Sequence, residues 1–294
     1  MNPPVLELSR LSKTFRPRDA MPLRAVDDVS LHIERGECVA LVGESGSGKS
    51  TLARLALRLI APDSGTVRLQ GRSLMQFSPQ ALRAARLMMQ PIFQDPAASF
   101  NPRRTVRAIL SQVLVQAGAT SVGDEQLSAL LARVELRPAR DYLNRYPHEL
   151  SGGQRQRLAI ARAIAPQPAV IIADEPLSGA DVSIRAQILN LLVDLQRDFG
   201  VAYLLITHDM LVARAFSHRV AVMYRGRIIE EGSTGEVLAA PRHPYTQNLI
   251  AAVQSLDPPF AHDVPAPVDN RSGNPLQRGY AGSGPGASHL TLDR

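Results

Sequence analysis

Cysteine, tryptophan and lysine are all scarce in this chain of 294 residues. Cys38 is the single cysteine, which excludes a disulfide framework, a four-cysteine zinc site and an iron–sulfur cluster ligated by cysteines. A lone cysteine fits a reducing compartment. Tryptophan is absent, and of the 33 basic residues only Lys13 and Lys49 are lysines.

Long apolar segments are missing as well. No uninterrupted apolar stretch approaches the ~20 residues that a membrane-spanning helix needs. Met1–Ser9 lacks the basic start and apolar run of a signal peptide. The composition, 45% hydrophobic and 20% charged, is typical of a soluble globular protein. If the protein acts at a membrane, we expect other chains to cross it.

The net charge of +6 is modest, and the arginines are spread along the chain. A nucleic-acid binder would usually gather its basic residues on one face or in a patch interleaved with aromatics. We therefore expect no nucleic-acid partner. The simpler interpretation is that the arginines lie on solvated helix faces. Their surface charge would then favour an anionic membrane or an acidic partner.

One of the two lysines lies in a phosphate-binding pattern. Residues 43–50 read Gly-Glu-Ser-Gly-Ser-Gly-Lys-Ser, which is G-x-x-x-x-G-K-[ST] between an expected strand and an expected helix. The glycines let backbone N–H groups converge, and a compact ammonium fits that nest better than the guanidinium used almost everywhere else. The pattern predicts a nucleotide site in which Lys49 bridges the β- and γ-phosphates and Ser50 is a ligand of Mg²⁺. A flexible Gly–Ser turn is the weaker alternative.

Two adjacent carboxylates follow the apolar run Ala169–Ala173, which predicts a buried parallel strand. Side chains alternate along a strand, so Asp174 and Glu175 can have different functions. Asp174 would hold Mg²⁺ through its water shell, and Glu175 would act as a general base on the attacking water. The alternative interpretation is a solvated strand end with two acidic residues. It would account for the pair if no other motif were present, but it accounts less well for the pair in a chain that also has a phosphate loop.

A second anion-binding loop is expected at Leu150–Gln154, which reads Leu-Ser-Gly-Gly-Gln before a helix. Ser151 would cap that helix, and the free N–H groups of its first turn would attract an anion. A plain helix cap is the alternative interpretation.

Strands alternate with helices, which predicts a mostly parallel, doubly wound sheet with ligands at the carboxyl ends of its strands. Between residues 95 and 150 the pattern is helical only, which predicts a helical insert. The expected strands are Val5–Ser9, Asp28–Ile33, Glu37–Val42, Ala169–Ala173, Val201–Thr207 and a hairpin of Arg219–Tyr224 with Arg227–Glu231; the expected helices are Ser50–Ile60, Val106–Gly118, Glu125–Val134, Gln154–Ala165 and Ile184–Asp198.

The phosphate loop, the Ser-Gly-Gly loop and the acidic pair, in this order, resemble the ATP-binding cassette (ABC) ATPases over about residues 5–240. Members of that family dimerise head to tail, so that the Ser-Gly-Gly loop of one subunit closes over ATP held by the other. The resemblance implies an α/β fold: a P-loop NTPase (RecA-like) core, an N-terminal antiparallel β subdomain and a helical subdomain inserted at about 95–160. An extension is expected at 241–256, and the tail at 257–294, with six prolines and five glycines, is expected to be disordered.

The resemblance assigns roles residue by residue. Phe15 matches the aromatic that stacks on adenine, although a packing aromatic is nearly as good an interpretation. Gln94 matches the glutamine that senses the γ-phosphate, and His208 the histidine that contacts it. The implied nucleotide contacts are Phe15, Gly43, Glu44, Ser45, Gly46, Ser47, Gly48, Lys49, Ser50, Thr51, Ser151, Gly152, Gly153, Gln154 and Asp181; the implied catalytic residues are Glu175, His208 and Gln94; the implied Mg²⁺ ligands are Ser50, Gln94 and Asp174.

Two segments narrow the resemblance to the oligopeptide, dipeptide and nickel importers. They are Ile92–Pro96 followed by Ser99–Arg103, and Pro241–Thr246, which also fits a proline-punctuated helix start. The implied function is ATP hydrolysis that powers import at the cytoplasmic face of the bacterial inner membrane. The implied partners are a second ABC ATPase subunit (the resemblance suggests a distinct companion, with a copy of this chain as the alternative), two permease subunits and an extracytoplasmic solute-binding protein.

The chain departs from the family at residues 177–180, which read Leu-Ser-Gly-Ala where Thr-Ser-Ala-Leu is usual. We expect looser packing between subunits there and intact hydrolysis. The C-terminal cysteines that hold an iron–sulfur cluster in some relatives are absent, so that feature is not transferred.

Three other functions stay open. A soluble cassette acting on nucleic acid or ribosomes would usually carry zinc cysteines, a coiled coil or two cassettes. A regulatory module without turnover is disfavoured by Glu175 and His208, and an exporter by the importer-like segments. The cargo (peptide, nickel, metal chelate or opine) and the identity of the second ATPase subunit are not encoded.

Overall fold

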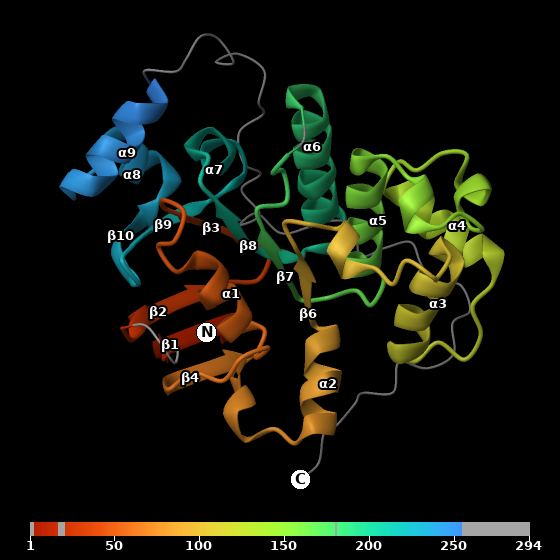
Figure 1. The fold of residues 1–294 in the computed structure, drawn as a ribbon, viewed down its shortest axis with the longest axis horizontal. Helices are drawn as coiled ribbons and strands as arrows, with labels where there is room; N and C mark the ends of the chain where they lie inside the picture. Colours follow the sequence, from red (N-terminus) through yellow and green to blue (C-terminus); the bar gives the residue numbers. More distant parts are fainter. Residues whose placement is uncertain (1–2, 17–20, 180, 255–294) are drawn as a thin grey trace.

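Two β-sheets organise the chain, which the computed structural model describes at residues 3–16, 21–179 and 181–254 (Figure 1). The strands are β1 (Leu6–Phe15), β2 (Leu23–Ile33), β3 (Cys38–Val42), β4 (Ser64–Leu69), β5 (Arg72–Ser73), β6 (Met89–Ile92), β7 (Val170–Asp174), β8 (Ala202–Thr207), β9 (Arg219–Tyr224) and β10 (Arg227–Ser233). The helices are α1 (Lys49–Ala56), α2 (Pro79–Leu87), α3 (Val106–Gln116), α4 (Asp124–Arg133), α5 (Gly152–Ile164), α6 (Val182–Phe199), α7 (Met210–Phe216), α8 (Thr234–Ala239) and α9 (Pro244–Gln254).

The larger sheet has the strand order β10-β9-β3-β8-β7-β6. Its strands β9, β3, β8, β7 and β6 are parallel, and β10 is an antiparallel edge. The smaller sheet, in the order β2-β1-β4-β5, is antiparallel throughout. The carboxyl ends of β3, β7 and β8 therefore meet at one edge, which is where ligands bind in sheets of this kind. The α/β fold expected from the sequence, with a mostly parallel core and an antiparallel N-terminal sheet, is confirmed.

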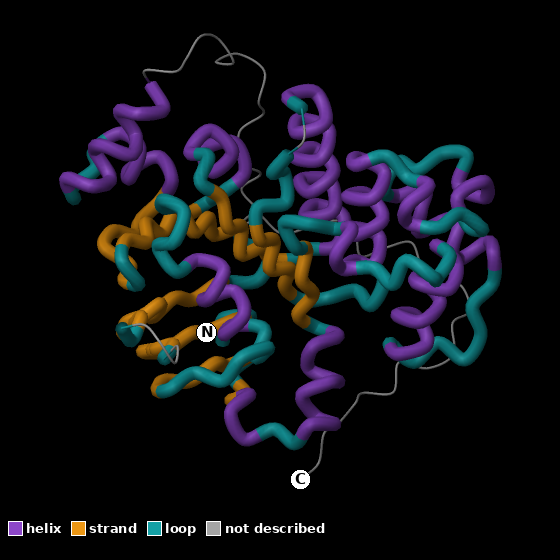
Figure 2. Tube along the Cα trace, in the orientation of Figure 1, coloured by secondary structure: helices purple, strands orange, loops and turns teal. Residues whose placement is uncertain are grey.

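Strand β3 is buried along its whole length because both faces of the larger sheet are covered. Val39 and Leu41 face a core that they share with α1 and the antiparallel sheet. Ala40 and Val42 alternate to the other face and pack in the core beneath α7, α8 and α9. Figure 2 shows the strands in two neighbouring groups, with helices around the larger one. The strand that leads into the phosphate loop is thereby held from both sides.

Helices α3, α4 and α5 gather at one end of the molecule, away from the antiparallel sheet (Figure 1). Their apolar faces meet in a core that includes Leu110, Leu127, Leu131 and Leu158, all fully buried. The expected helical character of this part of the chain is confirmed.

Some elements were not predicted. Strands β1 and β2 are longer than expected, reaching Phe15 and starting at Leu23, and β4, β6, α2, α7 and α8 had no counterpart among the predictions. The tail at 257–294 lies outside the described residues. Among the helices that are described, none combines the length and apolar character that crossing a bilayer requires.

Candidate functional site

The loop between β3 and α1 has a backbone that only glycine fits at two positions. Gly43 has φ +151°, and a Cβ there would lie 2.2 Å from the carbonyl oxygen of Met223. Gly48 has φ +110°, and a Cβ there would lie 2.2 Å from the carbonyl oxygen of Ala25. Both are contacts with backbone that cannot yield, so the loop presses against β9 and β2 with no room for side chains.

Lys49 opens α1 and turns back over this loop. Its ammonium donates to the carbonyl oxygens of Gly43 and Glu44, both at 2.7 Å, and the residue is only 5% exposed. Burial lowers the pKa of Lys49, and the carboxylates of Glu175, Asp174 and Glu44 counter only part of this effect. A buried cation held by neutral oxygens is suited to an anionic partner. The Ser47 hydroxyl, in the same loop, is also buried and finds no hydrogen-bond partner among the described residues.

A hydroxyl and a carboxylate meet beside Lys49. The Ser50 hydroxyl donates to Asp174 Oδ1 at 3.1 Å, across 124 residues of sequence. Burial raises the pKa of Asp174, and the nearby Glu175 adds to this, although the bond from Ser50 lowers it. Two oxygen groups this close form the kind of donor set that Mg²⁺ prefers.

Glu175 lies between two other predicted site residues. Gln94 Nε2 donates to Glu175 Oε2 at 3.1 Å, and His208 Nδ1 lies 3.2 Å from Glu175 Oε1. Gln94 also reaches the hydroxyl of Ser178 at 3.4 Å. The backbone of Glu175 has φ +48°, a left-handed conformation that turns the chain as it leaves β7. Both carboxylate oxygens therefore have a partner that fixes their direction.

A cavity of ≈ 990 Å³ joins these groups to the phosphate loop. Of the predicted site residues, it is lined by Phe15, Gly43, Glu44, Ser45, Gly46, Gly48, Lys49, Ser50, Thr51, Gln94, Glu175 and His208. Phe15 is 40% exposed, so its ring is open to stack on a planar ligand. The cavity is also lined by residues that the sequence did not single out as site residues: Leu23, Arg24, Ala25, Arg225, Gly226 and Leu249, together with Ser178.

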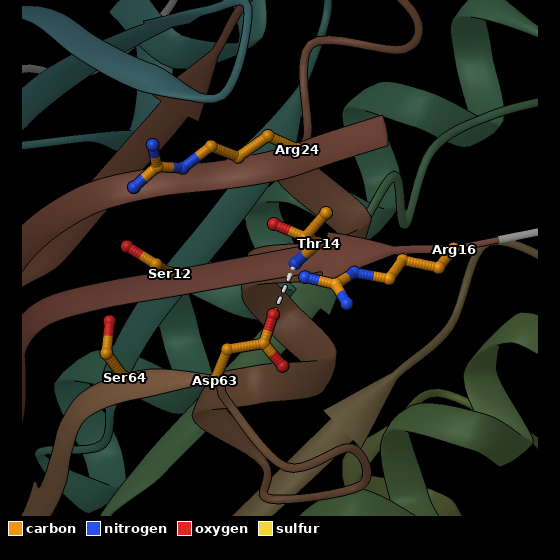
Figure 3. Close-up of a pocket in the computed structure, with 6 residues that line it drawn as sticks. All are labelled: Ser12, Thr14, Arg16, Arg24, Asp63 and Ser64. Atoms are coloured by element: carbon orange, nitrogen blue, oxygen red, sulfur yellow. Dashed lines mark hydrogen bonds between the residues drawn. The ribbon is translucent and has the colours of Figure 1, made fainter. Parts of the chain in front are cut away.

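A second hollow borders the strand that carries Phe15 (Figure 3). Within it, the carboxylate of Asp63 accepts the backbone N–H of Thr14 at 2.7 Å and the ammonium of Lys13 at 2.8 Å. The bonds from Lys13 and Thr14 lower the pKa of Asp63. Since Thr14 and Phe15 are neighbours on β1, this carboxylate fixes the strand end from which the aromatic ring projects.

Six predicted nucleotide contacts do not line the cavity of their own chain: Ser47, which is buried within the phosphate loop, together with Ser151–Gln154 and Asp181. Ser151 caps α5: its hydroxyl accepts the N–H of Gln154 at 3.3 Å, and Gln154 Oε1 accepts the N–H of Ser151 at 3.0 Å. Asp181 caps α6, accepting the N–H of Ile184 at 2.9 Å. Of the segment that departs from the family pattern, Ala180 lies outside the described residues.

Comparison with known proteins gives this geometry a context. Residues 26–178 match the ABC transporter family, and residues 229–276 match the C-terminal region of oligopeptide/dipeptide transporters. A probable peptide ABC transporter ATP-binding protein of Sinorhizobium fredii is 48% identical over 260 residues, covering 85% of this chain and 73% of that protein. A putative peptide import ATP-binding protein of Brucella ovis is 45% identical, covering 92% and 87%. A glutathione import ATP-binding protein of Shigella flexneri is 49% identical, covering 87% and 42%.

Solved structures agree with these matches. The dimeric structure of a bacterial ABC transporter cassette superposes with a TM-score of 0.71 at 29% identity, covering 78% of this chain and 98% of the cassette. The same cassette in a post-hydrolysis state, bound to ADP and phosphate, gives a TM-score of 0.69 at 30% identity, with the same coverage. Fold, site geometry and sequence similarity agree, and this chain belongs to the ABC transporter family as an ATP-binding, ATP-hydrolysing subunit.

Proposed function

We propose that this chain is the ATPase subunit of an importer for peptides or related small solutes. The observation that carries the proposal is the convergence of Lys49, Asp174, Glu175 and His208 on one sheet edge, in a chain whose C-terminal part matches the oligopeptide/dipeptide transporters. The relatives named for peptide or glutathione import support the solute class. An exporter, or a cassette acting on nucleic acid or ribosomes, is favoured by none of these matches.

The phosphate loop would hold the β-phosphate with its converging N–H groups, at the positive N-terminus of α1. The ammonium of Lys49, now on the carbonyl oxygens of Gly43 and Glu44, would move a short way to the β- and γ-phosphate oxygens. The adenine would stack on Phe15, which also lines the cavity. The nucleotide thus supplies the anion that the buried lysine is suited to meet.

Mg²⁺ fits the oxygen pair of Ser50 and Asp174, with the amide oxygen of Gln94 as a third donor. When bound there, the ion would neutralise charge that develops on the phosphate oxygens. The raised pKa of Asp174 marks a buried carboxylate whose charge would be stabilised by a cation.

Hydrolysis would use Glu175 as the general base. Its carboxylate takes a proton from water as the water oxygen attacks the γ-phosphorus, and the bond from that phosphorus to the bridging oxygen breaks to release ADP. Gln94 and His208 hold the two carboxylate oxygens in place. A neutral His208 that donates its Nδ1–H to Glu175 has no proton on Nε2. His208 would therefore donate from Nε2 to the γ-phosphate only when both ring nitrogens are protonated.

The ATP site is proposed to be completed by a second subunit. Ser151–Gln154 lie outside the cavity of their own chain, and the N–H groups of the first turn of α5 are suited to an anion brought by another chain. In this arrangement a second ABC ATPase, either identical or a distinct companion, lies head to tail against the first. Two permease subunits and an extracytoplasmic solute-binding protein complete the importer, and this chain would bind the permease at the cytoplasmic face of the inner membrane.

The segments of the chain are assigned accordingly. Residues 5–240 form the ATPase domain, with the helical subdomain at about 95–160, and 241–256 form the importer-type extension. The segment 95–104 would contact the permease and transmit closure of the dimer.

The test is the variant Glu175→Gln, which keeps the shape of the side chain and removes the base. We expect ATP affinity to stay close to that of the unmodified protein, and hydrolysis by the assembled complex to fall ~10²–10⁴-fold. Glu236→Gln, an exposed change on α8, is the control and should retain full activity. Full hydrolysis by Glu175→Gln contradicts the assigned role, and an unmodified chain that binds no adenine nucleotide contradicts the ATP site itself.

The solute class has a separate test. The ligand of the receptor protein that co-purifies with this chain can be identified by mass spectrometry. A peptide supports the proposal, and a nickel chelate or an opine overturns the peptide assignment.

A further inference from the structure

Helix α9 reaches the phosphate loop from the far end of the chain. The hydroxyl of Tyr245 accepts the backbone N–H of Glu44 at 2.9 Å, across 201 residues of sequence. Leu249, one turn further along α9, lines the nucleotide cavity itself. One face of this C-terminal helix is therefore part of the site.

The ring of Tyr245 is held by a neighbouring aromatic. Tyr224 packs against it with ring centroids 4.3 Å apart, and the guanidinium of Arg225 lies 5.1 Å from the Tyr224 ring. The next residue, Gly226, donates its N–H to the carbonyl oxygen of Ser47 at 2.9 Å. The β9–β10 hairpin thus braces the phosphate loop at Ser47 and supports the side chain that braces it at Glu44.

The start of α9 is fixed by a carboxylate on β10. Glu230 accepts the backbone N–H of Arg242 at 2.7 Å and that of His243 at 3.1 Å, groups that would otherwise lack partners just before the helix. Burial acts to raise the pKa of Glu230, but these two N–H bonds, together with the side chain of Thr246 and the charge of Arg242, outweigh it and lower the pKa. His243 Nδ1 in turn accepts the N–H of Tyr245 at 3.1 Å. A chain of contacts therefore runs from Glu230 to the loop.

Both sides of the Glu44 residue are engaged in this state. Its N–H is bonded to Tyr245 and its carbonyl oxygen to the ammonium of Lys49. When Lys49 turns to a phosphate, the carbonyl contact is released and the Tyr245 contact stays. A loop already fixed in this way loses less conformational freedom when it closes on a ligand.

We propose that Tyr245 is a positioning residue for the phosphate loop, through which the C-terminal extension sets the affinity for the phosphates of the nucleotide. The proposal rests on the ATP site proposed above. Tyr245 touches the loop and not the reacting atoms, so it acts on nucleotide binding and leaves the chemical step unchanged.

The test is Tyr245→Phe in the full chain, which removes one oxygen and keeps the ring. We expect the Kd for ATP and for ADP to rise about 2- to 12-fold, the range of one net hydrogen bond. In the assembled complex KM for ATP should rise with kcat unchanged, as for an interaction made equally in the ground and transition states. Tyr224→Phe is the matched control, because its hydroxyl has no hydrogen-bond partner in the described part of the chain, and its Kd should equal that of the unmodified protein.

A second variant tests the route. Glu230→Gln weakens the anchor of α9 and should raise the Kd for ATP in the same direction. The double variant should bind no more weakly than Tyr245→Phe alone, because both changes act through one contact. Three results would overturn the inference: an unchanged Kd in Tyr245→Phe, a lowered kcat with unchanged KM in that variant, or additive effects in the double variant. In each case, ATP binding by the unmodified chain would still support the ATP site. Absence of nucleotide binding by the unmodified chain overturns both.

Discussion

Lys49 is one of two lysines in a chain that otherwise uses arginine, and its surroundings explain the choice. The ammonium fits between two carbonyl oxygens at 2.7 Å while almost fully buried. A guanidinium is planar and presents its donors as a wide fork, so it cannot place a single charge in that space. The sequence predicts a phosphate-binding role for Lys49 from residue type and local spacing alone, and the geometry of the loop is consistent with that prediction.

Lys49→Arg keeps the charge but not the geometry, so we expect ATP affinity to fall by about 10- to 150-fold, the scale of one or two hydrogen bonds to a charged group. Arg133→Lys, the reverse exchange at a position outside the cavity, is the control. The Arg133 guanidinium lies 4.9 Å from the ring of Phe199, so ATP affinity should be unchanged. Equilibrium binding of ATP to each purified chain measures both, and equal Kd values for the two variants would contradict the role given to Lys49.

At the scale of secondary structure, the strands that end at the site were predictable and some of their neighbours were not. Strands β3, β7 and β8 are short apolar runs bounded by turns, the pattern of a strand buried on both faces. Strand β6 was missed because Pro91 lies within it. The structure shows why proline is tolerated there. Among the described strands β6 pairs with β7 alone and so lies at the edge of the sheet, where a residue without an N–H can be accommodated.

Helix α5 begins at the Ser-Gly-Gly loop, and its other end contacts the segment 95–104. Ser151 caps its first turn, and Arg162, near its last turn, donates to the carbonyl oxygen of Ser99 at 2.7 Å and to the Ser99 hydroxyl at 3.1 Å. The same guanidinium lies 4.8 Å from the ring of Phe100, and burial lowers its pKa. The segment proposed to contact the permease is therefore attached to the far end of the helix that begins at the Ser-Gly-Gly loop.

Arg162→Lys keeps the charge but removes the fork that reaches both oxygens of Ser99. We expect ATP affinity of the isolated chain to be unchanged, because Arg162 lines no part of the nucleotide cavity. Solute transport per ATP hydrolysed by the assembled importer should fall about 2- to 10-fold, the effect of losing roughly one hydrogen bond between helix and segment. Arg157→Lys, on the same helix but bonded to Val134, Glu135 and Gln187, is the control. Unchanged coupling in Arg162→Lys would contradict a role for this contact in transmission.

At the scale of the whole molecule, the site draws on residues from Phe15 to Leu249. Sequence predicted those that follow parallel strands, because the carboxyl ends of such strands share one edge. It did not predict the contributions of Arg225, Tyr245 and Leu249. These depend on how the last hairpin and α9 fold back onto the phosphate loop, and no local spacing encodes a hydrogen bond across 201 residues.

The position of Ser151 predicts that binding and hydrolysis of ATP can be separated. Ser151→Arg introduces a bulky cation at the positive end of α5, outside the cavity of its own chain. We expect the Kd for ATP of the isolated chain to stay within about twofold of the unmodified value, since a change of this size is under 0.5 kcal/mol. Hydrolysis in the ATP site that this loop is proposed to complete should fall ~10²–10³-fold, the effect of losing a preorganised anion-stabilising donor.

Ser233→Arg is the matched control for that experiment, because Ser233 caps α8 in the same way, its hydroxyl accepting the N–H of Glu236 at 3.3 Å. Each variant loses a helix cap worth ~1 kcal/mol, so both should show a similar fall in thermal stability. Only Ser151→Arg should reduce phosphate release by the assembled complex. If Ser151→Arg instead weakens ATP binding by the isolated chain, the loop serves its own cavity. If phosphate release is unchanged, no second subunit uses the loop, and the two-chain site is wrong.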